Sequence, residues 1–112
     1  MTLTMNQIAG RILKRSAPVI FSPEAKVEIS VGWSFELPRF FIEIEKIEPK
    51  CNFYEVIKAE TGLLDVLFMC PKETEEEVWR IIMRATSHCA KVNRNINSLN
   101  RLRSDAVVIL FL

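Results

Sequence analysis

Apolar side chains occupy every second position from residue 27 to residue 35, namely Val27, Ile29, Val31, Trp33 and Phe35. These residues are β-branched or aromatic, and the positions between them are polar or small. A period of two with side chains of this kind is typical of a strand that buries one face. The pattern therefore predicts a strand over residues 26–35.

A second alternating segment follows the turn around Leu37-Pro38 and predicts a strand over residues 39–47. Pairing the two strands across this turn sets Phe35 opposite Phe40 and makes their apolar faces coincide. We therefore expect Trp33, Phe35 and Phe40 on the inner face of a sheet. There they would either fill the core, with Trp33 buried between sheet and helix, or line a small apolar pocket.

The middle of the chain allows two interpretations. Asn52 followed by Glu55 resembles a helix cap. Thr61-Gly62, in contrast, suits a two-residue turn between strands over residues 53–60 and 63–70. We favour the hairpin because its predicted partners match in charge and polarity: Lys58 with Asp65, Val56 with Leu67 and Tyr54 with Met69.

Two segments have helical periodicity. Thr74 and Glu77 form the pattern of a capping box. Apolar residues then recur every three or four positions, and this stripe predicts one long helix over residues 75–102. The stripe comprises Val78, Ile81, Ile82, Ala85, Cys89, Val92, Ile96 and Leu99. A short helix is expected over residues 4–15, ended by Pro18, with an apolar side made of Met5, Ile8 and Ile12 and including Ala9 and Leu13.

The chain closes on a wholly apolar segment that predicts a strand over residues 106–112, too apolar for the edge of a sheet. Together the elements predict an α+β fold in a single domain, residues 1–112. A mostly antiparallel sheet of four to five strands (26–35, 39–47, 53–60, 63–70 and 106–112) would lie against the long helix 75–102, beside the short N-terminal helix 4–15.

Composition narrows the class of protein. The chain has 112 residues, of which 49% are hydrophobic and 26% are charged, and this excludes a disordered or low-complexity protein. No apolar run approaches the roughly 18 residues that a membrane-spanning helix needs. Three cysteines cannot all pair within one chain, so we expect free thiols, no disulfides and a cytoplasmic location.

Charge is unevenly distributed along the chain. Residues 1–22 carry three bases and no acid, residues 23–77 carry a net charge of −7, and residues 78–112 carry +5. The folded protein is therefore expected to have an acidic and a basic region. The basic side of the long helix is a candidate partner face, made of Arg80, Arg84, Lys91, Arg94 and Arg101.

No motif in the sequence indicates catalysis, a cofactor or a metal. Cys51, Cys70, His88 and Cys89 are zinc-ligand types, but they lack a C-x₂-C pair, and the adjacent His88 and Cys89 would diverge on a helix. We therefore expect no metal site, no cofactor and no catalytic residue. The alternating acids Glu43 and Glu45 fit a solvated strand face better than a glycosidase pair.

These observations lead to one functional hypothesis and two alternatives. We expect a small non-enzymatic protein that acts through association, as a homodimer or as a component of a larger assembly, because an apolar final strand needs cover on both faces. The first alternative is a small-molecule pocket protein or simple enzyme that uses a cavity between sheet and helix. The second is nucleic-acid binding by the basic helix, which a pI of 7.7 and the absence of interleaved aromatic residues disfavour.

Overall fold

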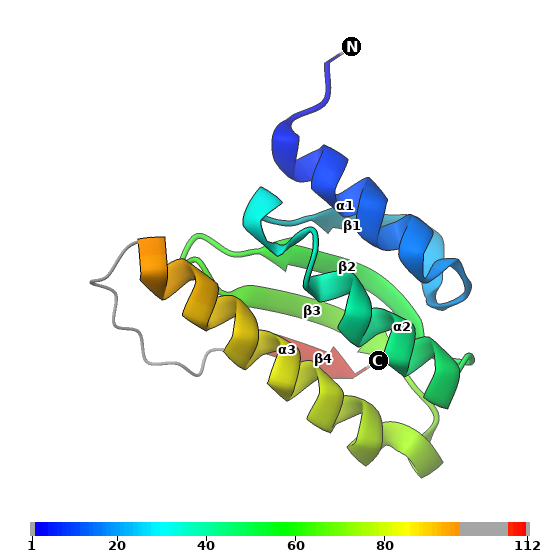
Figure 1. Ribbon diagram of the computed structural model, residues 1–112. Helices are drawn as coiled ribbons and strands as arrows, with labels where there is room; N and C mark the ends of the chain where they lie inside the picture. The colour runs from blue at the N-terminus through cyan, green and yellow to red at the C-terminus, as the bar shows by residue number, and fades with distance from the viewer. Residues whose placement is uncertain (1, 97–107, 112) are drawn as a thin grey trace.

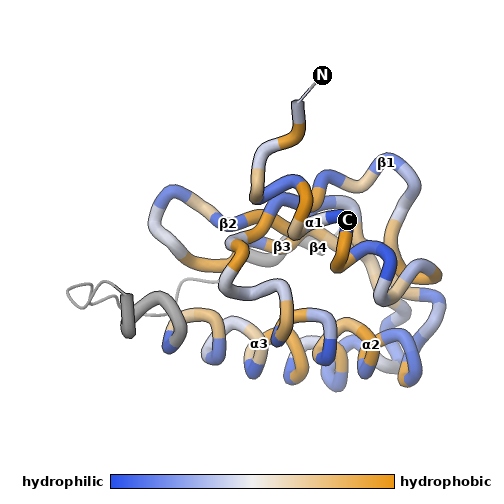
Figure 2. The backbone as a smooth tube through the Cα atoms, turned by 45° about the horizontal axis from the view of Figure 1, so that its top comes forward, coloured by the Kyte–Doolittle hydropathy of each residue, from blue (hydrophilic) through white to orange (hydrophobic). Residues whose placement is uncertain are grey.

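The computed structural model describes residues 2–96 and 108–111. The elements follow the chain in the order α1, β1, α2, β2, β3, α3 and β4, with short 3₁₀ turns η1 to η3 between some of them. Three helices lie in front of the strands in Figure 1, and Figure 2 shows α2 and α3 on one side of the sheet. The fold is α+β, as expected, with helices on one face of the sheet and none of the described elements on the other.

Helix α1 (Met5–Ser16) forms where the sequence predicts the short N-terminal helix. Its start is fixed by a capping box: Thr4 accepts from the backbone of Gln7, and the Gln7 side chain accepts from the backbone of Thr4. Pro18 opens the 3₁₀ turn η1 (Pro18–Ile20) directly after the helix. Of the predicted apolar side, the helix buries Ala9 and Leu13, together with Gly10, whereas Met5, Ile8 and Ile12 are exposed.

The hairpin predicted over residues 26–47 is wrong. Strand β1 (Phe21–Glu28) lies mostly upstream of the predicted strand 26–35, and the chain then forms the 3₁₀ turn η2 (Val31–Trp33). Residues 39–47 belong to helix α2 (Leu37–Ile47), with Pro38 in its first turn. Proline fits there because the first turn of a helix needs no N–H donor from it.

The apolar residues of this short segment fit both the period of a strand and the period of a helix, which explains the wrong prediction of a strand. Phe40, Ile42 and Ile44 alternate as a strand would, but Leu37, Phe41 and Ile44 are spaced by four and three and form the buried side of α2. The buried side of α2 packs on β2, where the ring centroids of Phe41 and Phe53 lie 5.0 Å apart. Tertiary packing thus selects the helix.

The second hairpin is present. Strands β2 (Asn52–Lys58) and β3 (Leu64–Met69) pair antiparallel, and Gly62 between them has a φ of 90°, a conformation that glycine adopts easily. Near the turn the predicted register is one residue off, because an Ala59 N–H to Leu63 carbonyl bond closes the turn. A register shift between Phe53 and Glu55 makes it two residues off at the far end. The pairs observed are Lys58 with Leu64, Val56 with Val66 and Asn52 with Met69.

Helix α3 (Glu75–Ile96) confirms a long C-terminal helix, and its predicted continuation to residue 102 lies outside the described residues. It follows the 3₁₀ turn η3 (Lys72–Thr74), and the Thr74 hydroxyl donates to the Glu48 carboxylate at 2.9 Å. The predicted stripe is buried as far as the described side chains reach: Val78, Ile81, Ile82, Ala85 and Cys89.

The sheet is mixed and not mostly antiparallel. Strand β1 pairs parallel to β2, β2 antiparallel to β3, and β4 (Val108–Phe111) parallel to β3. The order β1-β2-β3-β4 puts the apolar β4 at one end, where the sequence analysis expected an interior strand. The rest of the predicted strand 106–112 lies outside the described residues.

The core lies between the sheet and the helices. Its centre is a cluster of phenylalanine rings, in which Phe53 contacts Phe21, Phe41 and Phe68 with centroids 4.8 to 5.8 Å apart. Trp33 is fully buried beside them, as the sequence predicts. In the described ranges, no helix is long and apolar enough to cross a lipid bilayer.

Candidate functional site

The three aromatic residues predicted to share one inner face are separated in the structure. Trp33 is buried, Phe40 packs against the rim of the core, and Phe35 is 83% exposed. They diverge because η2 and α2 replace the two strands on which they were expected to align. The structure therefore does not bring them together around one pocket.

Trp33 has one unusual feature. Its indole Nε1 is buried and is the one such side-chain atom in the described part of the chain that lacks a hydrogen-bond partner. A buried donor without a partner costs free energy, on the order of 1–3 kcal/mol. The packing of the indole ring must outweigh this cost.

The predicted basic face lies partly along a groove between α2 and α3. The groove has a volume of about 620 Å³ and is lined by Arg39, Phe40, Met83, Arg84, Ser87, His88 and Lys91. Of the predicted bases, Arg84 and Lys91 line it and Arg80 is exposed one turn earlier on α3. Arg94 lies within α3, whereas Arg101 is outside the described residues.

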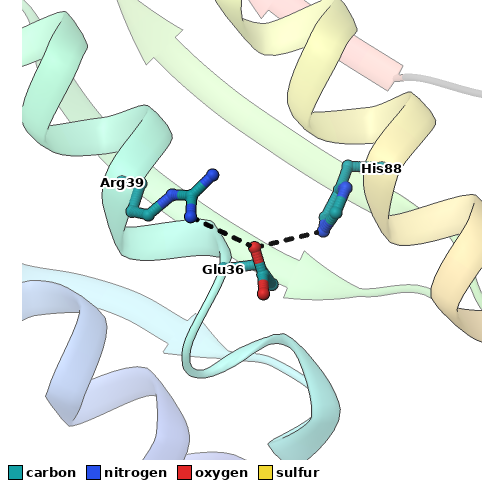
Figure 3. A network of polar contacts seen from close by, with 3 residues as sticks. All are labelled: Glu36, Arg39 and His88. Atoms are coloured by element: carbon teal, nitrogen blue, oxygen red, sulfur yellow. Dashed lines mark ion pairs between the residues drawn. The ribbon is translucent and has the colours of Figure 1, made fainter.

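Carboxylates engage several bases of this groove. Arg84 donates to Glu43 at 3.0 Å and lies 5.9 Å from the centre of the Phe40 ring. Glu36 lies between Arg39 and His88, at 3.8 and 3.4 Å, as Figure 3 shows. These pairs fit a salt-bridged face. Two of them, Arg84 with Glu43 and His88 with Glu36, join α3 to α2 and its N-terminus.

On the other side of the helical layer lies a surface that the sequence analysis missed. Met5, Ile8 and Ile12 are 62%, 42% and 46% exposed and follow one another at helical spacing along α1. Val31 and Phe35, 41% and 83% exposed, add two apolar side chains within and just after η2, a turn that contacts α1. We call these five residues the α1–η2 surface.

Helix α1 and the segment before η2 are held together by a backbone bond from the Ile29 N–H to the Asn6 carbonyl. Arg11 and Arg15 are exposed on α1 beside the apolar stripe, while Lys14 bends away and donates to the carbonyls of Pro23 and Ala25. The α1–η2 surface is therefore apolar with a basic flank. The helical spacing of these residues was visible in the sequence, but not which side of the helix would face the sheet.

On the opposite side lies the face of the sheet that none of the elements in residues 2–96 and 108–111 covers. Alternation along β2 and β3 sets Glu55, Ile57, Asp65 and Leu67 on this face, with Ile57 paired to Asp65 and Glu55 paired to Leu67. Tyr54 and Met69 belong to the same side, because the Tyr54 hydroxyl donates to the Met69 sulfur at 3.5 Å. We call these six residues the outer sheet face.

The centre of the outer sheet face carries negative charge next to apolar side chains. Partial burial raises the pKa of the Asp65 carboxyl above its ordinary value of 3.8, and the neighbouring charge of Glu55 raises it further. One base is close by, since Lys26 pairs with Glu55 in the register of β1 and β2. A cation placed against Asp65 would favour its charged form.

The three cysteines are free thiols. Cys51 and Cys89 are buried, Cys70 is half-buried, and burial raises the pKa of Cys89 to about 12. Among the described residues, no three His, Cys, Asp or Glu side chains gather as a metal site would require. The acids Glu43 and Glu45 lie on helix α2 and not on a strand.

Neither a family model, nor a curated protein, nor a solved structure matches this chain. Function must therefore be argued from the residues themselves.

Proposed function

We propose that this protein acts by self-association, in which the α1–η2 surface of one copy packs on the outer sheet face of the next. The observation that carries the proposal is the complementarity of these two surfaces. The α1–η2 surface has an apolar stripe flanked by Arg11 and Arg15. The outer sheet face sets the acids Glu55 and Asp65 beside half-buried apolar side chains. Apolar patches that remain exposed on a small domain commonly mark interfaces.

Like charges disfavour the two symmetric alternatives. A twofold axis through α1 would bring Arg11 and Arg15 of two copies together, and a twofold axis through the sheet would bring Glu55 and Asp65 together. The head-to-tail contact sets bases against acids. It also sets a base against the partly buried carboxyl of Asp65, whose charged form a neighbouring cation favours.

The position of the two surfaces determines the kind of assembly. They lie in different layers of the molecule, so one copy can use both at the same time (Figure 1). A contact between unlike surfaces closes into a ring or continues as a chain of copies. The homodimer expected from the sequence is then the first step of a larger assembly, with about 800 Å² buried on each copy.

Sedimentation over a range of protein concentrations tests this proposal. We expect the mass to rise above 12.9 kDa with concentration, and to pass that of two copies, with dissociation in high salt because the contact includes opposite charges. A single 12.9 kDa species at every concentration would exclude self-association.

A charge exchange tests the surfaces themselves. One variant carries Arg11→Glu and Arg15→Glu, and the other carries Glu55→Lys and Asp65→Lys. Each alone should stay monomeric, because its two surfaces then have the same sign, whereas an equal mixture should assemble. Assembly of either variant alone, or none in the mixture, would contradict the head-to-tail contact.

A matched control is available on α3. Arg80→Glu with Lys91→Glu reverses two exposed bases outside both surfaces, and this variant should assemble like the native chain. If it alone were monomeric, the interface would lie on the basic face predicted from the sequence. The same variant tests nucleic-acid binding, which would be lost along with that face.

A further inference from the structure

Two cysteines far apart in the sequence meet at one end of the β2–β3 hairpin. Asn52 and Met69 are the last paired residues at this end. Cys51 directly precedes Asn52 and Cys70 directly follows Met69. The antiparallel register therefore sets Cys51 and Cys70 opposite each other, one position beyond the last pair.

Residues directly opposite in an antiparallel pair have Cα atoms about 4.5–5.5 Å apart. A disulfide needs a Cα separation of about 4.4–6.8 Å, so the strand ends already provide the spacing. The two thiols also interact, since Cys51 and Cys70 each alter the pKa of the other. Closure of a bond between them requires no rearrangement of the sheet.

The two thiols differ in access. Cys51 is 2% exposed and belongs to the core, whereas Cys70 is half-buried at the edge of that core. The Cys70 thiol donates to the Pro71 carbonyl at 3.4 Å. An external reagent can therefore reach Cys70 first, and Cys51 lies behind it as the second thiol.

We infer that Cys51 and Cys70 form a reversible disulfide site that reacts with small disulfides of the glutathione type. The inference does not rest on the proposed self-association, because neither thiol belongs to the α1–η2 surface or to the outer sheet face.

The reaction balances in two exchanges. The Cys70 sulfur attacks one sulfur of the small disulfide, which forms a mixed disulfide on Cys70 and releases one small thiol. The Cys51 sulfur then attacks the Cys70 sulfur, which forms the Cys51–Cys70 bond and releases the second small thiol. The protein loses two electrons and two protons, and both small thiols carry them away.

The surroundings make this exchange slow. Burial raises the pKa of both thiols, strongly for Cys51, and the carboxylates of Glu48 and Glu75 add to the effect at Cys70. Since the thiolate is the nucleophile, only a small fraction reacts at neutral pH. The site therefore suits a sustained change of redox state and not a rapid catalytic cycle.

The experiment exposes the folded native chain to oxidised glutathione, then denatures it and counts its thiols. We expect the number of free thiols to fall from three to one, with a loss of two hydrogen atoms in the intact mass and a peptide that links Cys51 to Cys70. Cys89, 1% exposed on α3, should remain the free thiol. A reducing agent should restore all three.

Two variants separate the steps. Cys51→Ala removes the second thiol, so Cys70 should keep a stable glutathione adduct. Cys70→Ala leaves only buried thiols, so no adduct should form. Circular dichroism checks that each variant is folded, and the result on the native chain stands if one of them is not.

The inference is overturned if the native chain keeps three thiols after an incubation with oxidised glutathione at alkaline pH that lasts much longer than a small dithiol needs for full oxidation. It is equally overturned if the native chain stops at a glutathione adduct, or if the linked peptide contains Cys89.

Discussion

The carbonyl oxygen of Val27 lies where a side chain at position 10 would begin. A Cβ atom built on Gly10 would come 1.6 Å from that oxygen and 2.4 Å from the carbonyl carbon. Helix α1 therefore approaches the backbone of β1 more closely than any residue with a side chain permits. In the sequence Gly10 resembles a weak point of a helix, but in the fold it is the contact that allows α1 to lie on the sheet.

Gly10→Ala should destabilise the protein by at least about 2 kcal/mol, although alanine is the better helix former by about 1 kcal/mol. The added methyl group collides with backbone, which cannot rotate away. Urea denaturation measures the change, and Arg11→Ala, at an exposed position one residue later, should stay within about 0.5 kcal/mol of the native chain. A Gly10→Ala protein as stable as the native one would contradict the close approach.

Trp33→Ala should cost about 3–5 kcal/mol, because it empties a fully buried site. Trp33→Phe should cost clearly less, since it keeps most of the ring and removes the unpartnered Nε1 donor. In a Trp79→Phe background, the native Trp33 should emit at short wavelength and resist soluble quenchers. Red-shifted, quenchable emission would remove Trp33 from the core.

Phe35 and Phe41 form a matched pair for testing the helix α2. Phe41→Ala should cost about 3–5 kcal/mol, because Phe41 is fully buried against Phe21 and Phe53. Phe35→Ala should leave the free energy of unfolding within about 0.5 kcal/mol, because its side chain is exposed. The strand predicted from the sequence would give the opposite ranking, so denaturation of the two variants decides between them.

The contribution of Asp65 to the free energy of unfolding should decrease as the pH rises. Its pKa is raised in the folded chain, mainly by burial and further by Glu55, so the folded state holds the proton at a pH where the unfolded state has released it. The contribution is therefore greatest below the unfolded pKa, about 3.9, and is lost as the pH rises through the folded value.

Asp65→Asn removes this loss, so in dilute protein it should raise the melting temperature at neutral pH and flatten the profile above pH 4. NMR titration of the Asp65 carboxyl should show a raised pKa. Repeated with Glu55→Gln, it should show a pKa that is lower but still raised, because burial remains. A pKa at or below the ordinary value would contradict the raised pKa and its proposed causes.

Elements whose signals are local could be predicted before the fold was known. The capping residue Thr4, the terminator Pro18, the turn at Gly62 and the long stripe of α3 each depend on neighbours within a few positions. Hydrophobic periodicity and turn-forming residues act over a few positions of sequence. The N-terminal helix, the β2–β3 hairpin and the C-terminal helix could therefore be predicted. The separation of charge along the chain was also visible in the sequence.

Features that depend on contacts between distant residues could not be predicted in this way. Leu37–Ile47 fits a strand and a helix equally well by its pattern, and burial of Phe41 against β2 selects the helix. Likewise, Met5, Ile8 and Ile12 are as apolar as a core-facing side would be. They remain exposed because the helix turns its Gly10 side toward β1, where the absence of a side chain lets the two backbones come into contact. The exposed α1–η2 surface and the opposed thiols of Cys51 and Cys70 follow from this packing and from the sheet register, neither of which has a local signature.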